Sequence, residues 1–337
     1  MARPYALLRA GLPYLKTLGM RRWTNYPVDV AVGADGTVYV LCRASGATLI
    51  RRLTWEDGDL GTIGGNGTGD GQFKWPATML MDRDGNLVVS DEELHRVTTI
   101  TTDGDFVGKW GEHGSAEGQL DHPAGIAFDP HENVYVADTL NHRVQRFTRG
   151  GKFILAFGRH GLGDGELDMP WGIAVDEMGD VYVADWHNDR IQKFTGEGAF
   201  IFALGRSGSG DGEFNRPAGV EVDDHGDIYV ADSGNDRVQM FNAEGRYLEK
   251  IIGDATLSRS GREYLLSNAK PMRLREMTSL EPQKRLRDPK TVRVDEQGRI
   301  FIPDYGSYRV QVYQKDVVML GEDDIVPPLR SPTLDVT

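Results

Sequence analysis

The stretch AGIAFDPHENVYVADTLNHRVQRFTRGGKFILAFG, residues 124–158, alternates short apolar runs with turn-forming residues. Runs such as VYVAD (134–138) and RVQRF (143–147) are rich in β-branched and aromatic side chains, which is typical of strands. Each break between runs carries Gly, Asn, Asp or Pro, the residues that favour tight turns. The stretch therefore predicts four consecutive antiparallel strands.

This pattern recurs along the chain. Each copy opens with a proline, at Pro27, Pro76, Pro123, Pro170, Pro217 and Pro289. From the second of these prolines to the fifth, the spacing is a constant 47 residues. Four antiparallel strands repeated with such a period form one blade of a propeller. The sequence therefore predicts an all-β fold, a six-bladed β-propeller that makes a single domain of residues 1–337.

The sixth copy ends early, because its third strand RVQVY (309–313) is followed by little of the pattern. Residues 12–19, LPYLKTLG, resemble the fourth-strand pattern KFILAFG of the third copy. We expect this N-terminal strand to complete blade six and close the ring. The segment DVVMLG (316–321) is a rival for the same place, and residues 322–337 are expected to form a C-terminal tail.

Composition and charge narrow the classes of partner. The chain has a formal net charge of −13 and a single cysteine, Cys42, so no intrachain disulfide is expected. An acidic surface disfavours binding to nucleic acid or to anionic membranes. No stretch approaches the ~20 apolar residues of a membrane span, and Arg9, Pro13 and Lys16 interrupt the N-terminal apolar run. We expect a soluble, cytoplasmic protein, and the sequence does not indicate its oligomeric state.

The connections between copies are rich in glycine, as in GRSGSGDGEFNRPAG (205–219). Such a stretch invites comparison with a phosphate-binding loop, or with a calcium-binding turn that has Asp211 as a ligand. However, related stretches begin at Gly64, Gly111 and Gly158, and none has the lysine that follows the glycines of a P-loop. A feature present at every such connection favours a repeated structural turn.

The repeated motifs P-x-G-I-A-V-D and VYVAD-x-x-N-x-R-V-Q-x-F resemble the NHL repeat, and the resemblance covers residues 27–314. It implies a six-bladed NHL-type propeller with four antiparallel strands per blade. It implies little about activity, because this architecture serves lyases, hydrolases, RNA-binding proteins and scaffolds. The Asp that ends the second strand and the Arg five residues later, as in Asp138 and Arg143, recur in five blades and are expected to hold the blade geometry.

Two enzyme families with similar propellers set expectations for metal sites. The peptidyl-hydroxyglycine lyases place zinc-binding histidines directly after the blade-opening proline. Here that position holds no histidine and is occupied by Val28, Ala77, Ala124, Trp171, Ala218 and Lys290. Gluconolactonase-like propellers bind a divalent ion through channel Glu, Asn and Asp residues, for which only Asp29 and Glu221 are candidates here.

One face of the ring collects residues at which the blades differ. Antiparallel order places the turn after the second strand and the blade-to-blade connection on the same face, around the channel mouth. Side chains at these positions are predicted to bind a ligand: Arg43, Glu92, Glu93, Trp171, Trp186, His187, Lys290 and Tyr305. The alternative is that this face is a solvent-exposed rim whose aromatic residues bind no ligand.

The fourth residue after each proline is expected to point into the channel. In blades one to four this residue is apolar, whereas blades five and six carry Glu221 and Arg293. These two residues form either a structural ion pair or part of a catalytic site. The catalytic candidates are Asp29, Glu221, Arg293 and His187, and Asp29 and Glu221 are also weak candidates for a metal.

Two histidine positions recur 47 residues apart, at His95 and His142 and at His113 and His160. Together with Glu92 or Glu93, such pairs would suit zinc. Duplication of solvated turns explains their register equally well.

The connection from blade five to blade six is long, with 72 residues between prolines in place of 47. The insertion, residues 254–288, loses the strand pattern. Thr256 or Ser258 is expected to cap one helix, and Pro271 to open another. The segment carries eight Lys and Arg against five Asp and Glu, so it is basic on an acidic body. We expect it to be a lid over the channel mouth or a docking element for a partner.

These features predict a propeller that binds a small-molecule or protein ligand at the lidded channel mouth, with no cofactor. The alternative is a lyase or hydrolase that acts through the channel carboxylates, with or without a divalent metal. Binding of single-stranded RNA is a third hypothesis, which the acidic charge disfavours. The sequence leaves open whether the protein is an enzyme.

Overall fold

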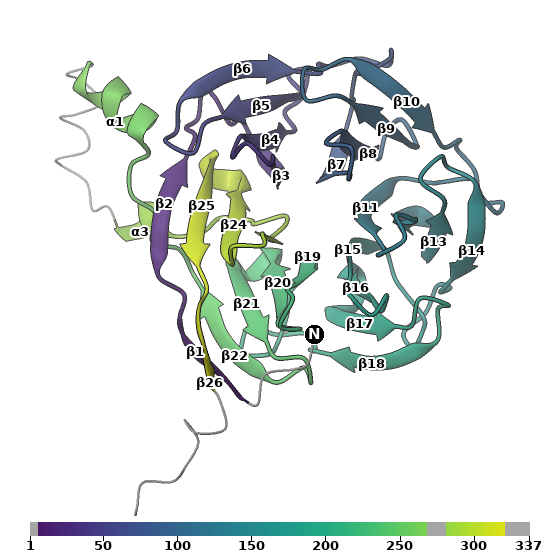
Figure 1. Cartoon of the computed structure of the whole chain (residues 1–337). Helices are drawn as coiled ribbons and strands as arrows, with labels where there is room; N and C mark the ends of the chain where they lie inside the picture. The colour runs from purple at the N-terminus through teal and green to yellow at the C-terminus, as the bar shows by residue number, and fades with distance from the viewer. Residues whose placement is uncertain (1–5, 268–280, 321–337) are drawn as a thin grey trace, which may run out of the picture.

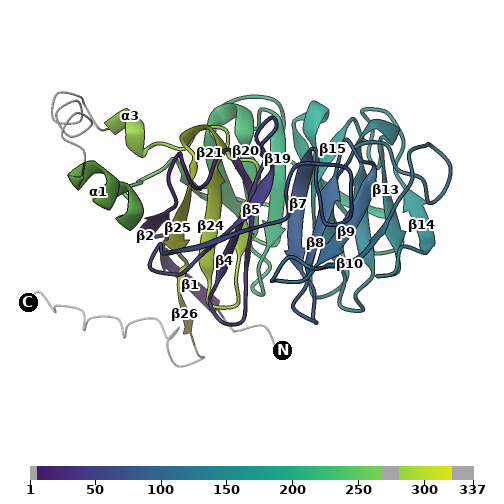
Figure 2. The same cartoon turned by 90° about the horizontal axis from the view of Figure 1, so that it is seen from above.

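The computed structural model describes residues 6–267 and 281–320. They form six four-stranded antiparallel sheets arranged in a ring around a central channel (Figure 1). Seen from the edge, the strands run between the two faces of the ring (Figure 2). The predicted six-bladed β-propeller is therefore confirmed. Within the two described ranges, no helix is long and apolar enough to cross a membrane.

In each blade the first strand lines the channel and the fourth lies at the circumference (Figure 1). Blades one to three comprise β3 (Pro27–Val32), β4 (Val38–Cys42), β5 (Leu49–Leu53) and β6 (Asp59–Ile63); β7 (Pro76–Met81), β8 (Leu87–Asp91), β9 (Arg96–Ile100) and β10 (Phe106–Trp110); and β11 (Pro123–Phe128), β12 (Val134–Asp138), β13 (Arg143–Phe147) and β14 (Phe153–Phe157). Blades four to six comprise β15 (Pro170–Val175), β16 (Val181–Asp185), β17 (Arg190–Phe194) and β18 (Phe200–Leu204); β19 (Pro217–Val222), β20 (Ile228–Asp232), β21 (Arg237–Phe241) and β22 (Tyr247–Ile251); and β23 (Arg293–Val294), β24 (Arg299–Asp304), β25 (Arg309–Gln314) and β2 (Tyr14–Leu18). We name the face at which the blades begin the proline face, after Pro27, Pro76, Pro123, Pro170, Pro217 and Pro289.

Blade six is built from both ends of the chain. The N-terminal strand β2 pairs antiparallel with β25, with Leu18 opposite Val310. The rival C-terminal segment forms β26 (Asp316–Leu320), which pairs instead with β1 (Ala6–Gly11) in a separate two-stranded sheet. Leu18 is fully buried between blades six and one, so β2 contributes to the core as well as to the ladder.

The hydrophobic core consists of clusters that each lie between two neighbouring blades. The second strands supply much of this core, since every residue of β12 and of β16 is buried. Alternate side chains of a strand point to opposite faces of its sheet, so both faces of a second strand are covered by adjacent blades. The fourth strands face solvent, and β14 accordingly alternates half-buried and exposed side chains.

A carboxylate at the end of the second strand ties each of several blades to the connection before it. In blade three, Asp138 accepts the N–H of Asp121 (2.6 Å) and the Nε of Arg143 (2.7 Å), and Arg143 also donates to carbonyls of the connection. Blades four, five and six repeat the Asp–Arg pair. Blade two differs from the expectation, because Arg96 donates only to carbonyls of the connection, and Asp91 accepts backbone N–H groups instead.

The glycine-rich connections satisfy their own polar groups. In the stretch 205–219, the Glu213 carboxylate accepts the N–H of Gly210 (2.9 Å) and pairs with Arg206 (2.8 Å). Asp211 pairs with Lys250 at 2.6 Å. A carboxylate of the chain thus lies where a phosphate would need to bind, which supports the interpretation as a structural turn.

The insertion between blades five and six begins with a capped helix. Ser258, rather than Thr256, is the N-cap of α1 (Arg259–Leu266), and its side chain accepts the N–H of Gly261 at 3.0 Å. A short helix, α3 (Glu281–Lys284), precedes the return to blade six. Both helices lie beside β2, outside the ring (Figures 1 and 2).

Candidate functional site

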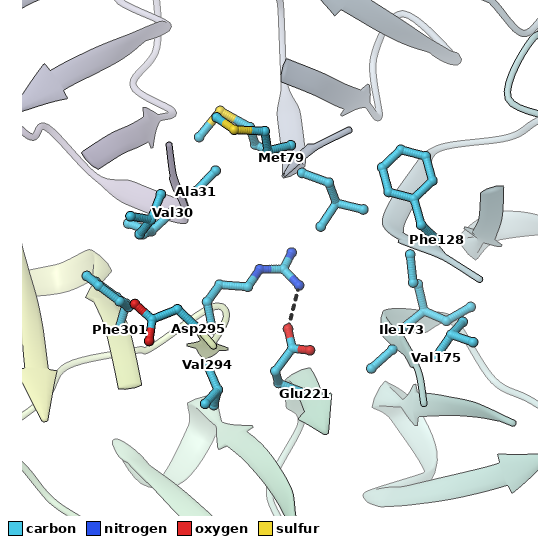
Figure 3. Close-up of a pocket in the computed structure, with 16 residues that line it drawn as sticks. Val30, Ala31, Met79, Phe128, Ile173, Val175, Glu221, Val294, Asp295 and Phe301 are labelled. Atoms are coloured by element: carbon cyan, nitrogen blue, oxygen red, sulfur yellow. Dashed lines mark hydrogen bonds and ion pairs between the residues drawn. The ribbon is translucent and has the colours of Figure 1, made fainter. Parts of the chain in front are cut away.

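A cavity of about 320 Å³ occupies the channel (Figure 3). Most of its lining residues have apolar side chains, but polar atoms contribute almost as much of its surface as apolar atoms do. The lining residues are Val30, Ala31, Val32, Met79, Leu80, Met81, Ala127, Phe128, Ile173, Ala174, Val175, Glu221, Arg293, Val294, Asp295 and Phe301. All six inner strands contribute, mainly through the half of each strand farther from the proline face. The small alanines in blades one, three and four leave open the space that Leu80 takes up in blade two.

Arg293 joins the two channel carboxylates. Its Nε and Nη2 donate to Asp29 at 2.9 and 2.6 Å. Its Nη1 donates to Glu221 at 2.9 Å (Figure 3). Asp29 is fully buried and also accepts the Thr291 hydroxyl (3.0 Å) and the N–H of Met79 (2.8 Å). Both Asp29 oxygens are therefore engaged, whereas the Glu221 side chain is 20% exposed and lines the cavity.

The surroundings shift the protonation of these groups. Burial raises the pKa of the Glu221 carboxyl, and the charge of Arg293 opposes the shift. Burial by itself would lower the pKa of Arg293, but the charges and hydrogen bonds of Asp29 and Glu221 outweigh burial and raise it. The guanidinium therefore stays charged, and the Glu221 carboxyl takes up a proton more readily than an exposed glutamate does.

These contacts do not fit the divalent ion that gluconolactonase-like propellers bind in the channel. A hard cation needs several converging oxygens that are free to coordinate it. Here a guanidinium already stands between Asp29 and Glu221. Among the described residues, groups of three or more possible metal ligands lie on the proline face and not in the channel. The geometry favours the interpretation of Glu221 and Arg293 as an ion pair.

The channel is narrow on the side of the proline face. A Cβ atom added to Gly125 would lie 2.3 Å from the carbonyl oxygen of Trp171, and one added to Gly172 would lie 2.5 Å from that of Ala218. The inner strands of blades three, four and five thus approach each other through their backbones. As a result, the cavity and the binding residues predicted on the proline face lie toward opposite ends of the inner strands.

Trp171, Trp186 and His187 form an aromatic group on the proline face. The two indole centroids are 5.5 Å apart, and His187 stacks on Trp186 at 4.6 Å. The guanidinium of Arg216 lies 4.9 Å from the Trp186 ring. Both indoles are half-buried and His187 is exposed. The group presents aromatic surface to solvent, and none of the three side chains lines the main cavity.

The other residues predicted to bind a ligand are engaged with one another. Arg43 is buried and pairs with Glu92 at 2.8 Å, and burial raises the pKa of Glu92 against the charge of Arg43. Lys290 lies over the ring of Tyr305 at 5.3 Å. Glu93 is exposed at the rim. The structure therefore sorts the predicted residues into several small groups.

The described part of the insertion does not form the lid expected over the channel mouth. The N–H and hydroxyl of Ser260 donate to Asp57 of blade one at 2.8 and 2.6 Å, which holds the start of α1 at the circumference. The reason is topological: the connection leaves blade five from its outermost strand, so residues added there project from the rim (Figure 1). The helix expected at Pro271 lies outside the described residues, as do all of residues 268–280.

The repeated histidines meet aspartates rather than Glu92 or Glu93. The carboxylate of Asp121 lies near His95, His113 and His122, and that of Asp168 lies near His142, His160 and His187. Asp121, Asp168 and His122 were not among the residues predicted from the sequence. They stand one or two residues before a blade-opening proline, and the rule that places the connections on this face would have included them.

Comparison with known proteins supports the fold. The NHL repeat family matches residues 120–147, 167–194 and 214–241, which span the first three strands of blades three, four and five. No curated protein sequence matches the chain.

Solved propellers match the chain over most of its length. Virginiamycin B lyase from Staphylococcus aureus aligns with a TM-score of 0.56 and 12% identity, covering 92% of this chain and 100% of that one. A streptogramin B lyase aligns with a TM-score of 0.56 and 10% identity, covering 90% and 98%. A gluconolactonase from Xanthomonas campestris aligns with a TM-score of 0.60 and 14% identity, covering 92% and 100%. At these identities the likeness is one of fold.

Proposed function

We propose that this six-bladed NHL-repeat propeller binds a small molecule with both apolar and polar groups in its central channel. The observation that carries the proposal is the cavity of about 320 Å³, which apolar side chains line on most sides and the charged pair Glu221 and Arg293 lines at one side (Figure 3). Small-molecule sites combine such volumes with apolar walls and few polar groups. A ligand with one hydrogen-bonding group would meet this pair and fill the space beside Ala127 and Ala174.

The charged pair is preorganised for such a ligand. Asp29 holds Arg293 through two hydrogen bonds, so the guanidinium does not need to be ordered when a ligand enters. The apolar side chains of the wall supply affinity in proportion to the buried area, and the pair sets the orientation of the ligand.

A test is to fill the cavity with the side chain that blade two already carries at this position. The triple variant Ala31→Leu, Ala127→Leu and Ala174→Leu places leucine where Leu80 stands in blade two. The fluorescent probe 8-anilinonaphthalene-1-sulfonate, which combines an apolar body with one anionic group, should bind the wild-type chain. We expect the triple variant to lose most of the probe fluorescence, because the space is no longer available.

The control is Ala116→Leu, the same chemical change at an exposed position. It should bind the probe as the wild type does. Equal fluorescence of the triple variant and the wild type, with both folded by circular dichroism, would contradict binding in the channel.

A lyase or hydrolase that uses Glu221 as a proton donor is the second candidate. The observation that favours it is the burial of Glu221, which raises the pKa of its carboxyl toward the range useful for general acid catalysis. A lyase and a gluconolactonase are among the proteins of similar fold. Once a channel ligand is known, Glu221→Gln should abolish its turnover and leave its binding within a few-fold. Turnover unchanged by this substitution would remove the candidate.

The aromatic group Trp171, Trp186 and His187 is a separate candidate contact surface, for a protein or another ligand on the proline face. Half-buried indoles beside an arginine are typical of binding hot spots. Substitution of both tryptophans by alanine separates the two surfaces, because the channel cavity keeps its lining residues.

A further inference from the structure

Two clusters of histidines lie on the proline face, one between blades two and three and the other between blades three and four. We propose that each cluster binds one Zn²⁺ ion. In the first cluster an oxygen of Asp121 lies 2.7 Å from His122 Nδ1 and 3.5 Å from His113 Nε2. His95 Nδ1 lies 3.6 Å from the same oxygen. One carboxylate is thus surrounded by three imidazoles.

The second cluster repeats this arrangement around Asp168. One of its oxygens lies 3.2 Å from His142 Nδ1 and 3.6 Å from His160 Nε2. The other oxygen lies 3.4 Å from His187 Nδ1. Here too three imidazoles converge on one carboxylate.

Both sets have the chemistry and the spacing of a zinc site. Three histidines and an aspartate supply four nitrogen and oxygen ligands, as a tetrahedral site requires. Zinc–ligand bonds of ~2.0–2.2 Å place the ligand atoms about 3.4 Å apart. Ligand atoms of His95, Asp121 and His122 lie within 4.8 Å of one another, as do those of His142, His160 and Asp168. Small rotations of partly exposed side chains therefore bring either group of three to coordination distance. His113 and His187, which lie 3.5 and 3.4 Å from the aspartate oxygens, are the proposed fourth ligands.

Duplication of the repeat does not account for the third histidine of each cluster. It explains why His95 corresponds to His142 and His113 to His160, since each pair is 47 residues apart. The position of His122 holds Met169 in the next blade, and the position of His187 holds Leu140 in the preceding one. Two different positions have each added an imidazole to the same kind of carboxylate.

The fold does not require these histidines either. His95 Nδ1 accepts the N–H of His122 at 3.1 Å, and His142 Nδ1 accepts that of Met169 at 3.1 Å. In blade four, Asp189 accepts the corresponding N–H of Arg216 at 2.7 Å. A carboxylate thus serves this turn as well as an imidazole does. Coordination through Nδ1 would replace one polar contact of the turn by a metal bond.

A third junction between blades has the same backbone but lacks the histidines. Between blades four and five the positions of the cluster hold Asp189, Ser207 and Asn215, with no histidine. The backbone of this junction is the same as that of the preceding one, because Ser207 forms a parallel β-bridge with Phe214 as His160 does with Leu167. Asn215 shows that the fold tolerates an asparagine at the position that Asp121 and Asp168 occupy in the two histidine clusters.

The test uses that substitution. Metal-free, tag-free protein is titrated with Zn²⁺ by calorimetry, and we expect two ions per chain. Asp121→Asn and Asp168→Asn should each remove one ion, and the double variant should bind neither. We expect each affected site to weaken by at least about 10–100-fold, the loss common even for outer-sphere partners. In histidine NMR spectra, Zn²⁺ should shift the rings of both clusters and leave His131 and His225 unchanged.

The matched control is His131→Ala, which removes an exposed histidine outside both clusters and should still bind two ions. Loss of one ion in only one of the aspartate variants would retain that cluster and refute the other. No saturable binding to the wild type, or unchanged binding to the double variant, overturns the proposal. The inference does not depend on the channel ligand, because probe binding in the cavity is measured with metal-free protein.

Discussion

Blades three to five and blade six share one plan of four strands, but different contacts hold them to their neighbours. The inner strands of blades three, four and five each meet the next blade through backbone atoms, at Gly125, Gly172 and Gly219 respectively. Where blade six meets blade one, the inner strand β23 is only two residues long, and side chains make the contacts instead. Thr291 donates to the carbonyl of Val28 (2.8 Å), and Arg293 binds Asp29.

The difference indicates where charged groups enter the channel of this repeat protein. Uniform blades stack on each other in the same way, and their polar groups repeat with them. The junction that closes the ring joins blade six to blade one, and the contacts of the uniform blades are not repeated there. There Arg293 binds the buried Asp29 of blade one and also reaches Glu221 of blade five, which places charged groups in the channel wall. Each kind of junction can be disrupted separately by deletion or substitution.

The largest effect is expected from deletion of residues 1–20, which removes the closing strand β2. The variant loses the fully buried Leu18 and the ladder with β25, and it exposes the edge of β25. Burial of one leucine contributes about 1.5–3 kcal/mol, and each lost hydrogen bond adds about 1 kcal/mol. Because β2 and β25 pair at four positions, urea unfolding should show a loss of at least about 5 kcal/mol.

A shorter deletion, of residues 1–11, is the control, because it removes β1 and keeps β2. It should be distinctly more stable than the longer deletion. Equal stability of the two deletions would mean that β2 does not close the ring in solution.

The second effect is expected from Arg293→Ala. This change leaves Asp29 buried without its counter-charge, and breaking a buried pair typically costs about 3–5 kcal/mol. The exposed pair of Arg159 and Glu166 provides the comparison, since Arg159→Ala should change the free energy of unfolding by less than about 0.5 kcal/mol. Urea titration measures both. Similar losses in the two variants would refute the structural role of the channel pair.

The smallest of the three effects is expected from Gly172→Ala in blade four. The added Cβ would meet backbone atoms of Ala218 and Gly219 at 2.5 and 2.7 Å, so the inner strands must separate. Overpacking of this kind costs about 1–3 kcal/mol. In Gly108→Ala, on the outer strand β10, the Cβ would have no neighbour within 4 Å. A melting temperature lowered equally by both changes would show that backbone contact at the channel is not what holds the uniform blades.

Prediction from sequence was strong for the blades and weak for the sites. The spacing of the prolines and the alternation in runs such as VYVAD located the strands, because these patterns reflect which faces must be buried. The register of Glu221 and Arg293 placed both in the channel, where they meet. The described parts of the insertion lie at the circumference (Figure 1), because composition indicates that an insertion is basic but not over which surface it lies. Asp121 was missed because it has no unusual pattern of its own.

A repeat of this length specifies its fold locally. Each four-stranded unit has two apolar faces that it cannot bury alone, so units of equal length must stack, and closing the stack into a ring buries the last face. Contacts between segments that are distant in the sequence are not specified locally. Asp29 and Arg293 are 264 residues apart, and His122 and Asp121 gain the distant His95 only when neighbouring blades dock. Ring closure and blade packing decide such meetings, because they depend on the curvature of the whole assembly and not on any single stretch of the chain.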